Sequence, residues 1–376
     1  MKITIAGDSH GKCMVAILEG IPAGVRIDED LIRNDLFRRR NCYGRGERMK
    51  IEEDAFEIVS GLWKGVTTGA PVTILVPNRA GNPVKDVRSV PRPGHIDYAA
   101  WVKYKLPDLN VYVERSSARW TVALTAAGAL LKSLLREFGI EVLGFVTRLG
   151  GVEAKDIPND FEELKRKRNE SEVFCPDPVA TKEMIVEIDR AKREGNTLGG
   201  KVRVVAKGIP AGIGSYSDLF KKLDSKIGSL FFTIPAVKGV VVGNEEMWYG
   251  FDYLDEFEIL DGKIRRKTNN LGGIEGGISN GEDIWVNVYV KPIPTTGKPL
   301  DSVDLRAMKP EKTPYVRSDV TAVPPASVVC EAALAVVLSD VLLDHLGEGN
   351  INDLKRRFEN EDLPRWDDGF WKEHDR

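Results

Sequence analysis

The stretch GIPAGVRIDEDLIRNDL, residues 20–36, returns in the second half of the chain as GIPAGIGSYSDLFKKLD, residues 208–224. Two further pairs follow in the same order: GVTTGAPVTILV with GISNGEDIWVNV, and RSSA with RSDV, each before an apolar segment. Chance is the alternative, because GIPAG alone is only a short run of turn-forming residues. Three pairs in one order favour an internal duplication with pseudo-two-fold symmetry, its halves covering about residues 1–150 and 196–350.

Three long helices are expected from apolar periodicity. Over 29–40, apolar residues recur at helical spacing, and Asp28 before them is of a type that caps a helix N-terminus. A second helix is expected over about 117–138, followed by Gly139 at a position favoured for C-terminal caps. A third is expected over about 324–346, where the sequence is almost wholly apolar.

The remaining segments are charged or strand-like. Residues 155–195 are typical of a solvated helical excursion, and 351–376 of a short helix plus a charged tail. Strand-like runs come in pairs separated by glycine turns, and no GxGxxG follows a strand, which leaves a nicotinamide-binding Rossmann unit without support. We therefore predict one α+β domain over 1–376, with antiparallel sheets inside and the long helices outside.

The composition excludes several classes of protein. A chain of 376 residues that is 42% hydrophobic can bury a sizeable core, and no uninterrupted apolar run reaches the ~20 residues that a membrane span needs. Its four cysteines have no metal-ligand spacing, so we expect neither a metal site nor a disulfide framework. The net charge of -3 argues against a surface built for nucleic acid. We expect a cytoplasmic protein.

The stretch RRRNCYGRGERMK, residues 38–50, holds six basic residues and a single acid. One interpretation is a solvated helix end or an RNA-binding patch. The other is an anion site, because Arg39 and Arg45 lie on either side of a Tyr-Gly bend and can aim two planar forks at one ligand. Three more arginines lie beside other unusual turns: Arg92, Arg115 and Arg119. Together they would form a positive pocket for a small, multiply charged ligand.

Two of the four histidines lie in glycine-flanked turns, GDSHG at 7–11 and RPGHID at 92–97. An imidazole titrates near neutral pH, so His10 and His95 are candidates for proton transfer, although a lone turn histidine is more often a surface or hydrogen-bonding residue. Asp319, in the RSDV repeat, can serve as a base or orient one.

Three further stretches fit a phosphorylated or flat ligand. Ser116 and Ser117 of ERSSAR are expected at the start of a long helix, where free amides attract phosphate, although ordinary capping explains them as well. The run GGIEGGISNG, residues 272–281, either lets backbone approach a ligand closely or is a flexible loop. KPIPTT, residues 291–296, adds a lysine and two hydroxyls after a strand.

Taken together and in order, GDSHG, RRR…YGRG, RPGHID, RSSAR, FFTIPAVKG, GGISNG, KPIPTT and RSDVTAVP resemble the chorismate synthase family over nearly the whole chain. The resemblance implies a shikimate-pathway lyase that converts 5-enolpyruvylshikimate 3-phosphate to chorismate and phosphate. It implies a homotetramer and a β-α-β sandwich of antiparallel sheets flanked by helices, with pseudo-symmetric halves. It also implies dependence on reduced FMN without net redox change.

Residue by residue, the resemblance implies that His10 protonates the departing phosphate, that His95 acts on the reduced flavin, and that Asp319 assists proton removal at flavin N5. Which imidazole does which stays open. Arg39 and Arg45 would face the substrate, at positions also associated with NADP, and we add Arg119 to them. The residues implied around FMN are Arg115, Ser116, Ser117, Ala236, Gly276, Lys291, Pro292, Ile293, Pro294, Thr295 and Arg317.

Two residues depart from the family's usual pattern. Asp8 and Trp120 each stand where the family usually has Glu, and the second change removes any hydrogen bond that this Glu would make.

We expect reduced flavin from a separate flavin reductase, NADPH only as an indirect reductant, and neither nucleic acid nor membrane as a partner. The alternatives are another enzyme that binds FMN or a sugar phosphate, or an RNA-binding module that uses residues 38–50.

Overall fold

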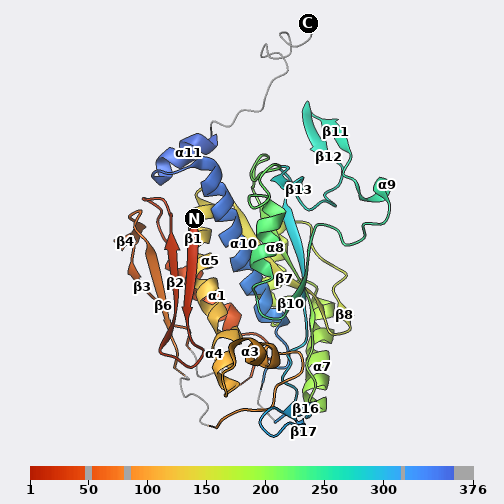
Figure 1. The fold of residues 1–376 in the computed structure, drawn as a ribbon. Coiled ribbons are helices and arrows are strands. Elements are labelled where there is room, and N and C mark those ends of the chain that lie inside the picture. Colours follow the sequence, from red (N-terminus) through yellow and green to blue (C-terminus); the bar gives the residue numbers. More distant parts are fainter. Residues whose placement is uncertain (47–52, 80–85, 315–317, 360–376) are drawn as a thin grey trace.

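The computed structural model describes residues 1–46, 53–79, 86–314 and 318–359, which contain two antiparallel sheets and a pair of long helices (Figure 1). The first sheet has four strands in the order β1-β2-β6-β3: Lys2–Gly7, Cys13–Glu19, Val72–Pro77 and Glu57–Ser60. Along β2 and β6, buried residues alternate with more exposed ones, so this sheet packs one face against the core.

The second sheet has five strands in the order β10-β15-β9-β7-β8: Val237–Val242, Ile284–Val290, Gly200–Lys207, Glu141–Leu149 and Val152–Glu153. Taken in the opposite direction, four of its strands lie in the order β7-β9-β15-β10, which matches the order β1-β2-β6-β3 of the first sheet. In both sets, the strands that come first, second, fourth and third along the chain are neighbours in that order. In each half a GIPAG turn follows the second strand and leads to a helix, α1 (Glu29–Arg40) or α8 (Leu223–Phe231).

Two long helices, α5 (Thr121–Arg136) and α10 (Val323–Leu346), fill the space between the sheets. They pack so closely that a Cβ atom on Gly128 would lie 2.5 Å from the Cα of Ala332. α5 contacts β2 and β6 of the first sheet, and α10 contacts β7 and β9 of the second. The prediction that the long helices lie outside is therefore wrong, because helices that are apolar all round need cover on all sides.

α10 alone among the described helices is long and apolar enough to cross a membrane, but 94% of its most apolar window is buried inside the protein. It is the core helix of this fold, which is why a nearly uninterrupted apolar sequence is tolerated there.

Helix ends follow the predictions where capping signals are strong. α1 begins after Asp28, whose carboxylate accepts a hydrogen bond from the amide of Asp30. α7 (Pro178–Glu194) ends at Gly195, which has a left-handed φ of +67°. α5 begins later than predicted, because Ser117 caps a short 3-10 turn, η1 (Ala118–Trp120), that precedes it.

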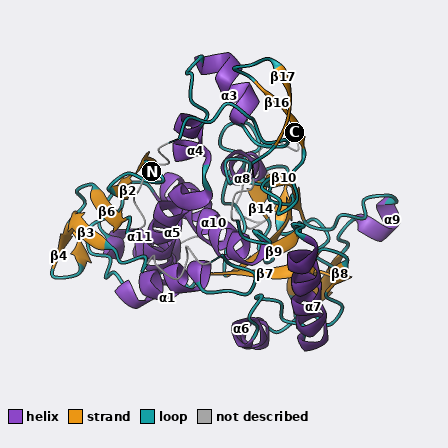
Figure 2. Cartoon of the chain, turned by 90° about the horizontal axis from the view of Figure 1, so that it is seen from below, coloured by secondary structure: helices purple, strands orange, loops and turns teal. Residues whose placement is uncertain are grey.

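Two helices that the sequence analysis did not predict, α3 (Asp97–Tyr104) and α4 (Asn110–Ser116), pack on each other at one end of the molecule (Figure 2). Both are short, so their periodicity is weak.

The predicted short helix after 350 is confirmed as α11, and residues 360–376 lie outside the described part. The other elements are β4 (Leu62–Trp63), β5 (Val66–Thr67), α6 (Phe161–Glu170), α9 (Gly250–Tyr253), β11 (Phe257–Leu260), β12 (Lys263–Arg266), β13 (Ile274–Glu275), β14 (Ile278–Ser279), β16 (Asp301–Asp304), β17 (Lys309–Lys312) and α11 (Ile351–Glu359).

Candidate active site

The turn that carries His10 joins β1 to β2 and is held by Glu114 of α4. The amide of Ser9 donates to the Glu114 carbonyl at 2.9 Å, and the amide of His10 donates to the Glu114 carboxylate at 2.8 Å. The second carboxylate oxygen lies 2.7 Å from His10 Nδ1. Because Nδ1 is engaged with a carboxylate, the ring orientation is fixed and Nε2 is directed to the opposite side of the ring.

Asn78, just after β6, links the His10 turn to Arg119. Its amide nitrogen donates to the carbonyls of Asp8 and Gly11 at 3.0 and 2.9 Å. Its side-chain oxygen accepts a hydrogen bond from Arg119 Nε at 2.7 Å. The turn and this arginine are therefore positioned by one side chain.

Arg39 and Arg119 share one buried carboxylate, that of Asp54. Arg119 Nη1 lies 2.5 Å from Asp54 Oδ1, and Arg39 Nη1 lies 3.6 Å from Oδ2. Burial lowers the pKa of Arg39 to about 10; Asp54 opposes this change, and the neighbouring Arg45 and Arg119 add to it. Two guanidinium groups against one carboxylate leave the pocket positive, as an anionic ligand requires.

Arg45 and Asp319 line a cavity of about 600 Å³, a volume in the range of small-molecule sites. Arg45 Nη1 lies 2.5 Å from Asp319 Oδ2, and the amide of Gly46 donates to Oδ1 at 2.5 Å. Asp319 also contributes to the electrostatic environment of Arg39, so this cavity adjoins the arginine pocket. Further polar side chains that line it are Lys192, Asn196, Thr197 and Thr295.

His95 lies in the turn before α3, next to the fully buried Asp97. His95 Nδ1 is 2.5 Å from Asp97 Oδ1, and Arg92 Nε donates to Oδ2 at 3.0 Å. Burial by itself would raise the pKa of Asp97, but the hydrogen bonds from His95 and Arg92 hold it well below its ordinary value. Asp97 is thus a fixed anion that orients the imidazole, the arrangement that carboxylate-histidine pairs use in catalysis.

The His95 turn is joined to the KPIPT segment, residues 291–295. Arg92 Nη1 donates to Thr295 Oγ1 at 3.1 Å, and Lys291 Nζ donates to the carbonyl of Gly94 at 3.0 Å. The amide of Lys291 donates to the carbonyl of Ala236 at 2.9 Å. The KPIPT segment therefore contacts the His95 turn through its first and last residues, and Thr295 also lines the cavity that contains Asp319.

The RSSAR segment differs from its prediction. Ser116 ends α4, where its Oγ donates to the carbonyl of Tyr112 at 2.7 Å, and Ser117 precedes η1. Ser116 therefore does not begin the long helix as expected, whereas Ser117 caps the 3-10 turn that leads directly into it, which is the ordinary-capping alternative. The guanidinium of Arg115 lies over the ring of Trp120, 5.6 Å from its centroid, so this indole makes a cation–π contact.

One predicted site residue that the structure describes, Gly276, is not brought to this group. Gly276 lies in the β13–β14 hairpin, which adjoins the Ile284 end of β15, whereas Lys291 follows the Val290 end. A strand of this length separates its ends by roughly 20 Å, so Gly276 is remote within a single chain. Arg317 lies outside the described residues.

Several residues that hold the site were not predicted. Asp97 lies inside RPGHID and Glu114 inside ERSSAR, so a carboxylate close to each motif was available as a signal. Asp54 and Asn78 gave none, because only the tertiary fold brings them to Arg119.

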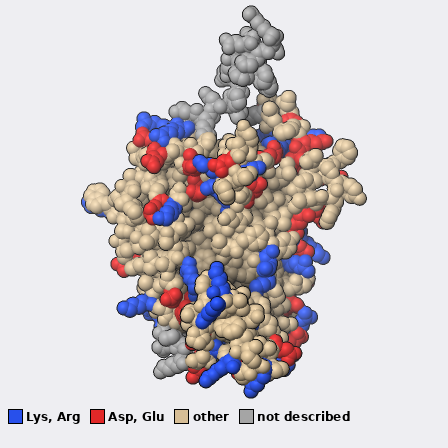
Figure 3. Space-filling view, viewed as in Figure 1, with Lys and Arg blue, Asp and Glu red and all other residues tan. Residues whose placement is uncertain are grey.

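The basic stretch 38–50 is not a solvated charge run in its described part. The Arg38 side chain is 15% exposed and Arg39 is buried. On one face of the molecule, acidic and basic side chains are interspersed around a broad uncharged area (Figure 3). This pattern does not favour an RNA-binding surface there, and residues 47–50 lie outside the described part.

The comparisons with known proteins agree with one another. The family model described as chorismate synthase matches residues 1–343. A curated chorismate synthase of Thermotoga maritima is 87% identical over 374 residues, 100% of both chains, and that of Aquifex aeolicus is 40% identical over 385 residues, 96% of this chain and 97% of the other. A solved structure titled as a crystal structure of chorismate synthase superposes with a TM-score of 0.79 at 35% identity, covering 96% of each chain.

Proposed function

This chain belongs to the chorismate synthase family, which makes it a lyase of the shikimate pathway, and we propose that its active site lies between the turns of His10 and His95. One observation carries the proposal. Polar contacts run from the His10 turn through Asn78 and Arg119 to Arg39, and from His95 through Arg92 to Thr295 in the cavity of Asp319. Segments remote in sequence are thereby held around one positive site.

The reaction is an anti 1,4-elimination that releases phosphate from 5-enolpyruvylshikimate 3-phosphate. The substrate carries one phosphate and two carboxylates, and Arg39, Arg45 and Arg119 match that charge with planar forks. His10 is the residue that hands a proton to the departing phosphate oxygen, because Glu114 fixes its ring through Nδ1.

The residues present fit reduced FMN, which lends electron density to the breaking C–O bond when bound and recovers it as the ring hydrogen leaves. The cavity of about 600 Å³ offers donors from Lys192 and Asn196 to an anionic, polar cofactor, and Asp189 lines the same cavity. Lys291 and Thr295 would hold the group from the side of His95. His95, oriented by Asp97, would hold the proton at this end of the site, and Asp319 would accept the one that is lost.

An anaerobic assay tests this function. The protein is mixed with dithionite-reduced FMN and 5-enolpyruvylshikimate 3-phosphate, and chorismate and free phosphate are measured. Both products are expected in equal amounts, and none without reduced flavin. A folded, flavin-bound protein that forms neither product would contradict the proposal, and so would binding of FMN with turnover of a different sugar phosphate only.

We also propose that the protein is a homotetramer whose interface uses the arm of residues 247–264. This arm exposes large apolar side chains: Trp248 (79%), Phe251 (101%), Ile259 (79%) and Ile264 (75%). A set of exposed apolar side chains of this size marks an interaction surface. Arg266, at the end of the arm, pairs with Glu275 at 2.8 Å, so Gly276 lies at the root of the arm and would complete the FMN site of a neighbouring subunit.

Replacing Ile259 and Ile264 together by lysine is expected to dissociate the tetramer, because two ammonium groups would be buried at an apolar interface. Sedimentation equilibrium should give four chains for the unmodified protein and fewer for the variant. FMN affinity should fall with the mass if Gly276 serves a neighbour. Val186→Lys on α7, a change at a residue 65% exposed, is the control and should alter neither quantity. Unchanged mass in the double variant would exclude this interface.

The remaining proposals concern the origin of the two halves, the source of the reduced flavin and the location of the protein. The shared strand order of the two sheets and the matching GIPAG turns support a duplication of one half. We infer that reduced flavin comes from a separate reductase, with NADPH as an indirect reductant. A cytoplasmic location fits both the pathway and a core role for α10.

A further inference from the structure

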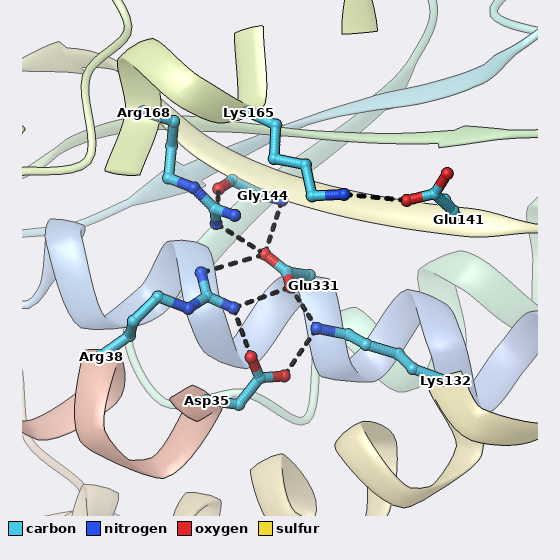
Figure 4. Close-up of polar contacts among 8 residues, drawn as sticks. All are labelled: Asp35, Arg38, Lys132, Glu141, Gly144, Lys165, Arg168 and Glu331. Atoms are coloured by element: carbon cyan, nitrogen blue, oxygen red, sulfur yellow. Dashed lines mark hydrogen bonds and ion pairs between the residues drawn. The ribbon is translucent and has the colours of Figure 1, made fainter. Parts of the chain in front are cut away.

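A second cavity, of about 710 Å³, shares the wall formed by Cys42 and Tyr43 with the cavity of Asp319. At its base lies a cluster of buried charges that the proposed activity does not use (Figure 4). The cluster comprises Asp35 and Arg38 of α1, Lys132 of α5, Arg168 of α6 and Glu331 of α10.

The Glu331 carboxylate lies at the centre of this cluster and is saturated with donors. The two Nη atoms of Arg38 donate to it at 2.8 and 3.3 Å. Arg168 Nη1 donates at 3.0 Å and the amide of Gly144 at 2.8 Å, and Lys132 Nζ contacts Oε1 as well. Five donors thus converge on a group with about four acceptor positions. Asp35 also accepts from Arg38 Nη2 at 2.5 Å and from Lys132 Nζ at 2.6 Å, and the Gly144 carbonyl accepts from Arg168 Nη1 at 3.1 Å.

Cations also outnumber carboxylates in this cluster. Within the described residues it contains three cations and two carboxylates, none more than 15% exposed at the side chain. Nε of Arg168 is buried and meets no hydrogen-bond acceptor in the part of the chain that the structure describes. Burial lowers the pKa of Arg168 to about 10 even though Glu331 opposes this change. An unbalanced buried charge is costly, so this base favours one additional anion.

The other residues that line the cavity favour an organic anion with a single negative charge. Phe37, Phe161 and Phe174 line it, and Phe37 is 52% exposed, with the guanidinium of Arg40 5.9 Å from the centre of its ring. Glu170 and Glu172 also line it but are exposed, so water and salt screen their charge. One negative charge balances the cluster, whereas a phosphate dianion would overcompensate it.

We propose that this cavity binds a small aromatic monocarboxylate, its carboxylate against Arg168 and Lys132 and its ring against Phe37 and Phe161. The site differs from the active site in its residues and faces the other side of the Cys42–Tyr43 wall. The proposal does not depend on the reaction that the protein catalyses.

Benzoate and its neutral isostere benzamide are the probes, titrated calorimetrically into the unmodified, full-length protein. Benzoate is expected to bind with one site per chain, and benzamide at least 10-fold more weakly, because only the carboxylate supplies charged acceptors. Equal affinities, or no benzoate binding up to about 10 mM, would overturn the proposal. This comparison needs no variant and so does not depend on whether any variant folds.

Variants then locate the site. Arg168→Met leaves two cations against two carboxylates, so the base becomes balanced without a ligand, and benzoate should bind about 10- to 100-fold more weakly. Lys165→Met removes a cation from the same cavity that Glu141 already pairs at 3.0 Å, and affinity should be retained. Arg45→Met tests the active site as the rival location. Loss of benzoate binding in Arg45→Met with retention in Arg168→Met would refute the assignment.

Discussion

Replacing His95 by alanine is expected to lower turnover by about 10²- to 10⁴-fold, the usual contribution of a positioned acid or base. The imidazole is held between Asp97 and Arg92, and its turn is bonded to Lys291 of the proposed flavin-binding segment. Alanine removes the imidazole with its contacts to Asp97 and Arg92, and leaves the hydrogen bond from Lys291 to the Gly94 carbonyl in place. Turnover under anaerobic conditions and FMN affinity by fluorescence quenching are the measurements, and FMN affinity should change far less than turnover.

His10→Ala is expected to produce a loss in the same range, since Glu114 also holds the backbone amide of His10 and Asn78 holds the carbonyls of Asp8 and Gly11, so the turn keeps these contacts. His345 provides the matched control, because it lies exposed at the end of α10, away from both turns. His345→Ala should retain full turnover. If all three variants have similar turnover, the two turn histidines are structural residues, and the proposed division of roles is wrong.

Local signals in the sequence were sufficient to predict those parts of the fold that local chemistry decides. Asp28 caps α1, and Gly195 ends α7 in a left-handed conformation that glycine adopts without strain. The layer order was not predictable in the same way. Periodicity shows that a helix has an apolar surface, but only the absence of a polar face on α5 and α10 places them between two sheets.

The candidate site also has parts that could be predicted from local sequence and parts that depend on long-range contacts. Histidines in glycine turns and paired arginines could be selected from residue type alone, and the structure brings the KPIPT segment against the His95 turn. The carboxylates that hold these groups depend on long-range contacts. Asp54 meets Arg119 across 65 positions of the chain, and no spacing rule connects them. Gly276 shows a further limit, because the glycine-rich run at 272–281 could be selected from the sequence, but its distance from the KPIPT segment within one chain could not be predicted from it.

Replacing Glu331 by glutamine is expected to destabilise the fold by about 3–5 kcal/mol, the range measured when one partner of a buried ion pair is removed. The change keeps the shape of the side chain, but Arg38, Lys132 and Arg168 would then share only Asp35. Guanidinium unfolding followed by circular dichroism measures the loss. Glu170→Gln is the matched control, because Glu170 makes an exposed pair with Arg166, and its loss should cost no more than about 0.5 kcal/mol.

Two further measurements distinguish lost charge balance from lost packing. Arg168→Met added to Glu331→Gln returns the cluster to an excess of one positive charge, so the double variant should be more stable than the sum of the single changes predicts. Burial would raise the pKa of Glu331, but Arg38, Lys132 and Arg168 hold it well below its ordinary value. Its stabilising contribution is therefore complete above the pKa of the unfolded chain, about 4.3, and is lost as pH falls toward the lower pKa of the folded state. The difference in stability between wild type and Glu331→Gln should shrink over that acid range; a difference independent of pH would assign the cost to packing.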